Sequence, residues 1–152
     1  MTFPQAVQAT PAVRSAYRRG LEALRRADAG RVQAENTQSL TGSLHLDEAF
    51  REAEPTASRW DYGIGYRHSR QEEAHWVEVH PASADHVDAV LNKLSWLQRW
   101  LGNEAPHLAR LTRGGFYWIA TDGRVAISSD SQQAKRLAKA GIHGPKRVLR
   151  LS

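Results

Sequence analysis

Two carboxylates stand in consecutive segments whose residue pattern predicts neighbouring β-strands. Asp61 lies within RWDYGIGYR, and Glu78 lies within AHWVEVH. Alternate residues of a strand share a face, so both carboxylates can face the same side of an antiparallel pair. Mg²⁺ prefers one or two carboxylates together with water, and such a cation promotes phosphodiester hydrolysis by activating water and neutralising phosphate charge. The spacing therefore predicts a divalent-cation site at Asp61 and Glu78, with Mg²⁺ or Mn²⁺ as the cofactor of an active enzyme.

Two further side chains can complete that site. His80 is two residues after Glu78 on the same strand face, and a neutral imidazole accepts a proton near pH 7. Asp47 ends the preceding predicted strand and would be a third metal-binding carboxylate. Like charges that close raise one another's pKa unless a cation is present. The alternative is that the two strand carboxylates are half-exposed and pair with Arg59 or Arg67.

Glycines are expected to form the floor of this site. Gly63 and Gly65 share the face of Asp61, and their missing side chains would let a phosphate backbone approach. The opposite face of the strand is expected to carry Trp60, Tyr62, Ile64 and Tyr66.

The surrounding pattern predicts helices and strands that alternate in a mixed α/β order. Apolar residues at a period near 3.6 predict helices over residues 13–30, 83–102 and 129–140. Alternating apolar and polar residues predict strands over residues 40–50, 59–67, 74–80, 116–119, 124–127 and 148–151. Short turns between the first three strands favour an antiparallel meander. Caps are expected from Ser83 and Ser129 at helix starts and from Gly102 and Gly141 at helix ends.

This order, helix, three strands, helix, strand, helix, resembles the PD-(D/E)XK nuclease superfamily. The resemblance spans residues 13–140 in element order. In motif it rests on Asp61 in the second strand and on Glu78-Val79-His80 in the third. It implies a restriction-endonuclease-like core with a mixed sheet, a bound divalent cation and nucleic acid as the substrate.

The chain departs from the family pattern at one position. That pattern places a lysine two residues after the acid, where this chain has His80. Some members take the lysine from the following helix, and the resemblance would then assign the role to Lys93. Some also place an extra acid in the first helix, which would be Glu22. The expected catalytic residues are therefore Asp61, Glu78, His80 and Lys93.

The length of 152 residues corresponds to one domain. We expect residues 1–12 to be a flexible lead-in, residues 13–140 to form the core, and residues 141–152 to form a basic tail. The chain has no cysteine, which fits a reducing compartment. It has no apolar run long enough to span a membrane and no recognisable signal peptide. These features predict a cytoplasmic protein without a membrane partner.

Charge is unevenly distributed along the chain. Residues 14–31 hold six arginines against two acids, a net charge of +4, and residues 131–152 carry a net charge of +6. Residues 47–88 hold ten acids against four arginines, a net charge of −6. Basic ends would attract a phosphate backbone, so nucleic acid is the expected partner. The alternative is that these charges are solvated helix faces.

Three functions remain open at this point. The first is a metal-dependent nuclease, and the second is a nuclease-like domain that has lost catalysis and binds nucleic acid or protein. The third is an α/β scaffold that forms a homodimer through Trp96 and Trp100, which lie four residues apart beside an apolar stripe.

Overall fold

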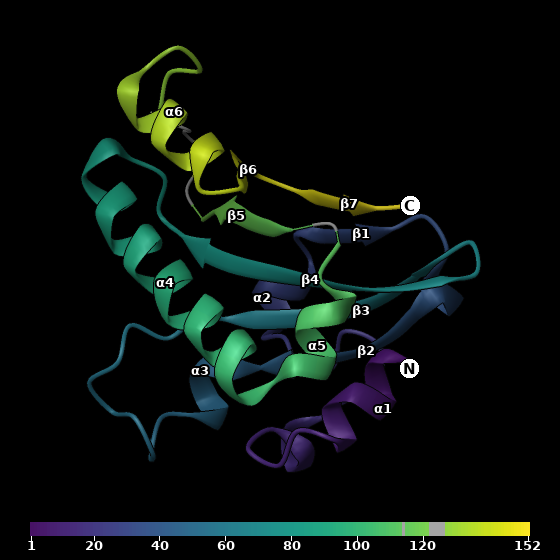
Figure 1. Cartoon of the computed structure of the whole chain (residues 1–152). Coiled ribbons are helices and arrows are strands. Elements are labelled where there is room, and N and C mark those ends of the chain that lie inside the picture. Colours follow the sequence, from purple (N-terminus) through teal and green to yellow (C-terminus); the bar gives the residue numbers. More distant parts are fainter. Residues whose placement is uncertain (114, 122–126) are drawn as a thin grey trace.

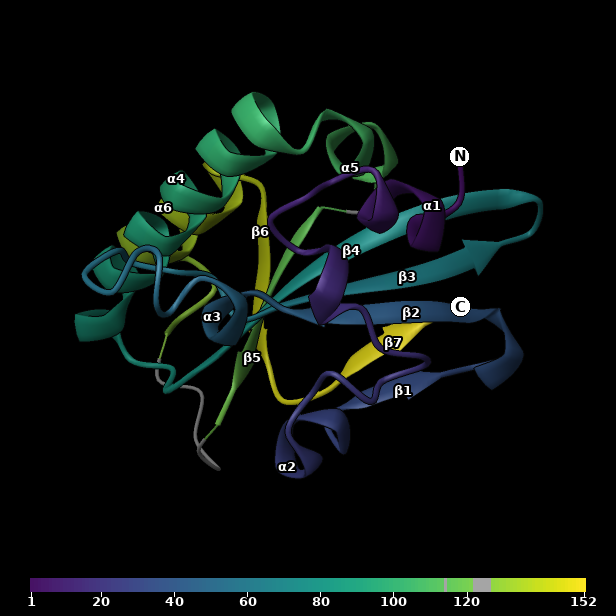
Figure 2. The ribbon, with the colours of Figure 1, turned by 90° about the horizontal axis from the view of Figure 1, so that it is seen from below.

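The computed structural model describes residues 1–113, 115–121 and 127–152, arranged in three layers. Figure 1 shows a central sheet crossed by helices, and Figure 2 shows that the sheet separates a helical layer from a smaller β-layer. The fold is therefore a mixed α/β domain built on a five-stranded mixed sheet, in agreement with the predicted class.

The central sheet has the strand order β2-β3-β4-β5-β6. Its strands are β2 (Leu40–His45), β3 (Tyr62–His68), β4 (Gln71–His80), β5 (Phe116–Ala120) and β6 (Ile142–Lys146). The first three are antiparallel neighbours, so the predicted meander is confirmed, whereas β5 runs parallel to both β4 and β6. A tight turn at Ser69, which has a φ of 58°, joins β3 to β4.

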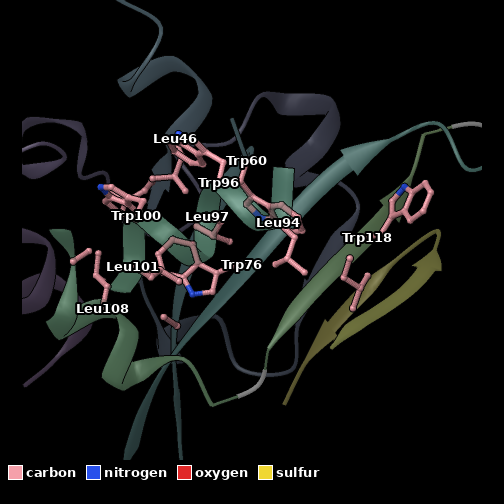
Figure 3. Close-up of a cluster of buried hydrophobic side chains, with 14 of the residues drawn as sticks. Leu46, Trp60, Trp76, Leu94, Trp96, Leu97, Trp100, Leu101, Leu108 and Trp118 are labelled. Atoms are coloured by element: carbon pink, nitrogen blue, oxygen red, sulfur yellow. The ribbon is translucent and has the colours of Figure 1, made fainter. Parts of the chain in front are cut away.

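Four helices cover one face of this sheet. They are α1 (Phe3–Gln8), α4 (Val87–Glu104), α5 (Pro106–Leu111) and α6 (Gln132–Lys139). Helix α4 makes the crossover from β4 to the parallel strand β5, as parallel pairing requires. Figure 3 shows its apolar stripe against the sheet tryptophans. Trp96 and Trp100 lie in this cluster with 5% and 4% of their surface exposed. They therefore belong to the core and do not form the exposed dimer surface that the scaffold hypothesis requires.

The other face of the sheet carries a small second sheet. Strand β1 (Val32–Ala34) pairs in parallel with β7 (Leu149–Leu151), next to the single-turn helix α2 (Arg26–Ala29). Side chains from this layer pack on the second face of the central strands, where the buried residues are Leu24, Val32, Tyr62, Ile64, Tyr66, Val77, Ile119, Leu149 and Leu151. Trp60, expected on the same face, instead joins the core under the helices.

The helix predicted over residues 13–30 is wrong. That segment contains only the 3-10 turn η1 (Arg14–Ala16), irregular backbone and α2. Gly20 has a φ of 49°, which interrupts any right-handed helix. Tyr17 packs directly over Gly42 of β2, and its hydroxyl donates to the carbonyl of Thr41. The aromatic and leucine spacing therefore reflects contacts of a wrapping loop with the sheet edge.

Several boundaries also differ from the prediction. The first predicted strand ends at His45, and the single-turn helix α3 (Leu46–Ala49) follows it directly. A short 3-10 helix, η2 (Thr37–Ser39), precedes the strand. Gly102 lies inside α4, which ends two residues later. Ser83 precedes the 3-10 turn η3 (Ala84–His86) without a side-chain cap. The cap of α6 is Ser131, whose Oγ accepts from the amide of Ala134, and not Ser129.

Both chain ends, expected as a flexible lead-in and a basic tail, contain regular secondary structure. Phe3, Ala6 and Val7 of α1 are fully buried. The last residues contribute β6 and β7, so the predicted final strand exists but belongs to the small sheet. The strand predicted over residues 124–127 lies largely outside the described residues. Within the described residues, none of the helices has the length and apolar character needed to cross a lipid bilayer.

Candidate metal centre

Asp61 and Glu78 meet at the end of the β3–β4 pair. The amide of Asp61 donates to Glu78 Oε1 at 3.1 Å, and the amide of Val79 donates to Asp61 Oδ2 at 2.9 Å. These two bonds extend the antiparallel pairing beyond its last matched residues, Tyr62 and Val77. The structure thus brings together the two carboxylates that the sequence places in neighbouring strands.

Lys93 of α4 completes a three-residue cluster with this pair. Its Nζ lies 2.7 Å from Glu78 Oε2, and 23% of the Lys93 side chain is exposed while Glu78 has none. The lysine is three residues after Val90 and four before Leu97, so it lies on the buried side of the helix. A single lysine inside that stripe is the sequence signal that identifies it. The Lys93 ammonium group thus lies between the helix and the two acids.

When both are ionised, Asp61 and Glu78 carry one more negative charge than Lys93 balances. Burial, together with the charge of Glu78, raises the pKa of Asp61 to about 7. Burial likewise raises the pKa of Glu78 to about 7, opposed by the neighbouring Lys93 ammonium. The pKa of Lys93 is raised, because the Glu78 and Asp61 charges outweigh the effect of its own burial. Lys93 therefore remains charged, whereas the two acids titrate near neutral pH.

His80 lies beside this cluster, with both ring nitrogens near other side chains. Its Nδ1 is 3.5 Å from Glu78 Oε2, and its Nε2 is 3.0 Å from Nδ1 of His86. Burial and the Lys93 charge lower the pKa of His80, so the ring is neutral at pH 7. The sequence prediction missed His86, although a histidine at the start of the helix that follows β4 was a usable signal.

Asp47 is near the pair but is engaged elsewhere. Its Oδ1 accepts from Arg59 Nε at 3.0 Å, and Arg51 approaches its other oxygen at 3.9 Å. The Asp47 charge still contributes to the raised pKa of Asp61. Among the described residues, no group of three or more histidine, aspartate or glutamate side chains is placed to hold a metal ion. Two carboxylates, and not three, are therefore the donors the structure offers.

The predicted glycine floor is wrong, because other side chains cover it. A Cβ on Gly63 would lie 2.5 Å from the ring of Trp76, and one on Gly65 would lie 2.4 Å from Phe3. These glycines admit core side chains against the sheet and do not leave it open to a phosphate backbone. The glycines therefore do not contribute an open surface to the site of Asp61 and Glu78.

The remaining expected partners are found at other places. Arg59 binds Asp47 instead of Asp61, and Arg67 is at the far end of β3. Glu22 is not in a helix and pairs with Arg19 at 3.6 Å on the exposed surface. The simple alternative, in which each strand carboxylate is locked to an arginine, therefore does not describe Asp61 or Glu78.

A divalent cation fits the chemistry of the Asp61–Glu78 pair. In the described part of the chain no hydrogen-bond donor reaches Asp61 Oδ1, so one carboxylate oxygen is free to bind a ligand. Mg²⁺ typically takes one or two carboxylates and fills its other positions with water. When both acids are ionised, Lys93 leaves one negative charge unbalanced, and a bound cation would neutralise it.

The chain matches no family model, and comparison with curated proteins and with solved structures returned no match.

Proposed function

We propose that this chain is a metal-dependent nuclease-like domain that hydrolyses phosphodiester bonds of nucleic acid. The observation that carries the proposal is the cluster of Asp61, Glu78 and Lys93, with Lys93 Nζ 2.7 Å from Glu78 Oε2. Two acids on neighbouring strands and a lysine from the next helix correspond to the version of the PD-(D/E)XK pattern in which the lysine comes from that helix. The mixed sheet, with a meander followed by a helical crossover to a parallel strand, is compatible with that core.

Each residue then has a definite task. Asp61 and Glu78 would hold Mg²⁺ or Mn²⁺, which when bound supplies an acidified water and charge neutralisation at the phosphate. Lys93 stays protonated, so it donates hydrogen bonds and stabilises negative charge and does not act as a base. His80 is neutral, but its two nitrogens already face Glu78 and His86. We therefore assign it to positioning Glu78, and Lys93 to the place beside the water.

One observation favours the catalytically impaired alternative. Glu78 has no exposed surface, and both of its oxygens already accept hydrogen bonds, from the Asp61 amide and from Lys93. In that case the cluster would be a structural network, and the domain would bind nucleic acid or protein without cleaving it. The difference between the two functions is whether a metal can displace part of this network.

Cleavage of plasmid DNA and of a structured RNA, with Mg²⁺, Mn²⁺ or EDTA, tests the proposal. The wild-type chain should cut at least one substrate with metal and neither with EDTA, and Asp61→Asn and Lys93→Met should abolish cutting. Asp88→Asn is the matched control, because Asp88 is an exposed acid on the same helix, paired with Arg136 at 2.6 Å. Equal cutting by the wild type and Asp61→Asn would eliminate this site. Binding without cutting by every variant would favour the impaired domain.

A further inference from the structure

Three arginines line one groove at the end of the β3–β4 hairpin. Arg67 belongs to β3, Arg70 to the hairpin turn, and Arg113 to the segment after α5. The groove has a volume of about 410 Å³ and also borders on the start of α1. All three arginines are exposed. Residues that are distant in the sequence thus place three guanidinium groups around a single concavity.

These arginines have no ionic partner in the part of the chain that the structure describes. Some arginines elsewhere are paired, such as Arg19 with Glu22, Arg59 with Asp47, and Arg136 with Asp88. Others donate to main-chain carbonyls, as Arg31 does to Ala120 and Thr121. Among the described residues, the groove arginines make neither kind of contact, and they are set apart by lining one concavity together.

The acid that borders the groove is already engaged. Glu72 Oε1 accepts a hydrogen bond from the amide of Phe3 at 2.9 Å, which ties the start of α1 to β4. One carboxylate against three guanidinium groups leaves an excess of positive charge in the groove. Mutual repulsion of such charges is relieved by a bound anion.

We infer that this groove binds backbone phosphates of the nucleic acid. Guanidinium groups present planar, paired N–H donors that match phosphate oxygens in a bidentate way. Phosphate contacts from arginine hold the strand in register without reading its sequence. The positive charge and the exposed arginines are observed, while the identity of the polyanion as nucleic acid rests on the proposed function.

The position of the groove relative to the metal centre suits a strand-holding role. Arg67 lies six residues after Asp61 along an extended strand, which corresponds to roughly 20 Å. One strand of a duplex advances about 3.4 Å per phosphate, so the separation spans roughly six phosphates. A substrate of a dozen nucleotides or more can therefore contact the groove and the metal centre together.

This assignment differs from what the basic chain ends suggest. Those ends hold more positive charge in sequence, but some of their arginines are occupied by acids or carbonyls. A matched control is therefore available in the chain itself. Arg25, Arg26 and Arg147 are exposed, lie outside the groove, and carry the same total charge as the groove triplet.

The test is equilibrium binding of fluorescent DNA and RNA 20-mers, single- and double-stranded, in EDTA over a series of salt concentrations. Arg67→Gln/Arg70→Gln/Arg113→Gln should weaken binding about ten-fold or more. It should also reduce the slope of log K against log salt by roughly two to three, the value for three lost phosphate contacts. The control triplet Arg25→Gln/Arg26→Gln/Arg147→Gln should keep most of the wild-type affinity and most of the salt slope. Circular dichroism should confirm that the two triple variants are folded.

The outcomes separate this inference from the proposed function. Equal affinities and slopes for the groove triplet and the wild type would overturn the groove, while metal-dependent cutting would leave the proposed function intact. Loss of binding in the groove triplet, with Asp61→Asn binding like the wild type, would support the groove whether or not the chain cuts. Equal losses in the two triplets would show general charge attraction and overturn a specific groove. The inference is also wrong if the wild type binds no nucleic acid, or if it binds inorganic triphosphate more tightly than the 20-mers.

Discussion

Replacing Asp61 by asparagine should stabilise the fold at alkaline pH, although most substitutions of largely buried residues destabilise a protein. Asparagine keeps an oxygen that can accept the Val79 amide, and it removes a charge that burial and Glu78 both oppose. The pKa of Asp61 is raised from 3.8 to about 7. Each unit of pKa corresponds to about 1.4 kcal/mol, so the charged form costs at most about 4 kcal/mol. Because solvent reaches part of this carboxylate, we expect a gain of about 2 kcal/mol.

The sign of the pH dependence follows from proton binding. In the unfolded chain Asp61 loses its proton near pH 4, whereas in the folded chain it retains the proton until about pH 7. Between these values the folded state binds more protons, so wild-type stability falls as the pH rises and levels off above pH 7. Asp61→Asn removes this loss. The stability difference between variant and wild type should therefore be near zero at pH 4 and largest at pH 8.

Urea unfolding monitored by tryptophan fluorescence, in EDTA at pH 4.5 to 8.5, measures this difference. Asp88→Asn serves as the control, since Asp88 is 77% exposed and should change stability by about 0.5 kcal/mol or less. In a second series, with Mg²⁺ in place of EDTA, the ion should stabilise the wild type at pH 8 by about 2.7 kcal/mol at a hundred times its Kd, and should not stabilise Asp61→Asn. A variant that is destabilised at pH 8, or a difference independent of pH, would refute the electrostatic reasoning.

Three other substitutions test neighbouring features. Lys93→Met should lower the free energy of unfolding by about 3 kcal/mol more at pH 8 than at pH 5, because it leaves the ionised Glu78 without its partner. Urea unfolding at the two pH values measures this difference, and equal losses would contradict it. Gly65→Ala should cost about 1–3 kcal/mol, since its Cβ would lie 2.4 Å from Phe3, and its melting temperature should fall. Gly102→Ala should raise stability by about 1 kcal/mol, because it lies in α4 with nothing within 4 Å of an added Cβ, and a lower melting temperature would count against that assignment.

The sequence pattern predicted an element correctly where one face of that element packs on a continuous apolar layer. Alternation in RWDYGIGYR and AHWVEVH indicated β3 and β4, because one face of each strand packs on a continuous apolar layer. The stripe from Val87 to Leu101 indicated α4 for the same reason. Spacing failed over residues 13–30, where Tyr17 and its neighbours follow the edge of the sheet and Gly20 takes a left-handed conformation. Helical periodicity there arose from contacts that are not helical.

The sequence by itself determined the class of the fold and the two carboxylates that face one another, because strand pairing and side-chain alternation are local properties. The sequence suggested Lys93 only through the family resemblance. The Lys93 ammonium reaches Glu78 because α4 crosses the sheet at that level. The engagement of Asp47 by Arg59, the cover over Gly63 and Gly65, and the convergence of Arg67, Arg70 and Arg113 also depend on packing between distant segments. Tertiary structure decided these features, since charge and burial act through space and not along the chain.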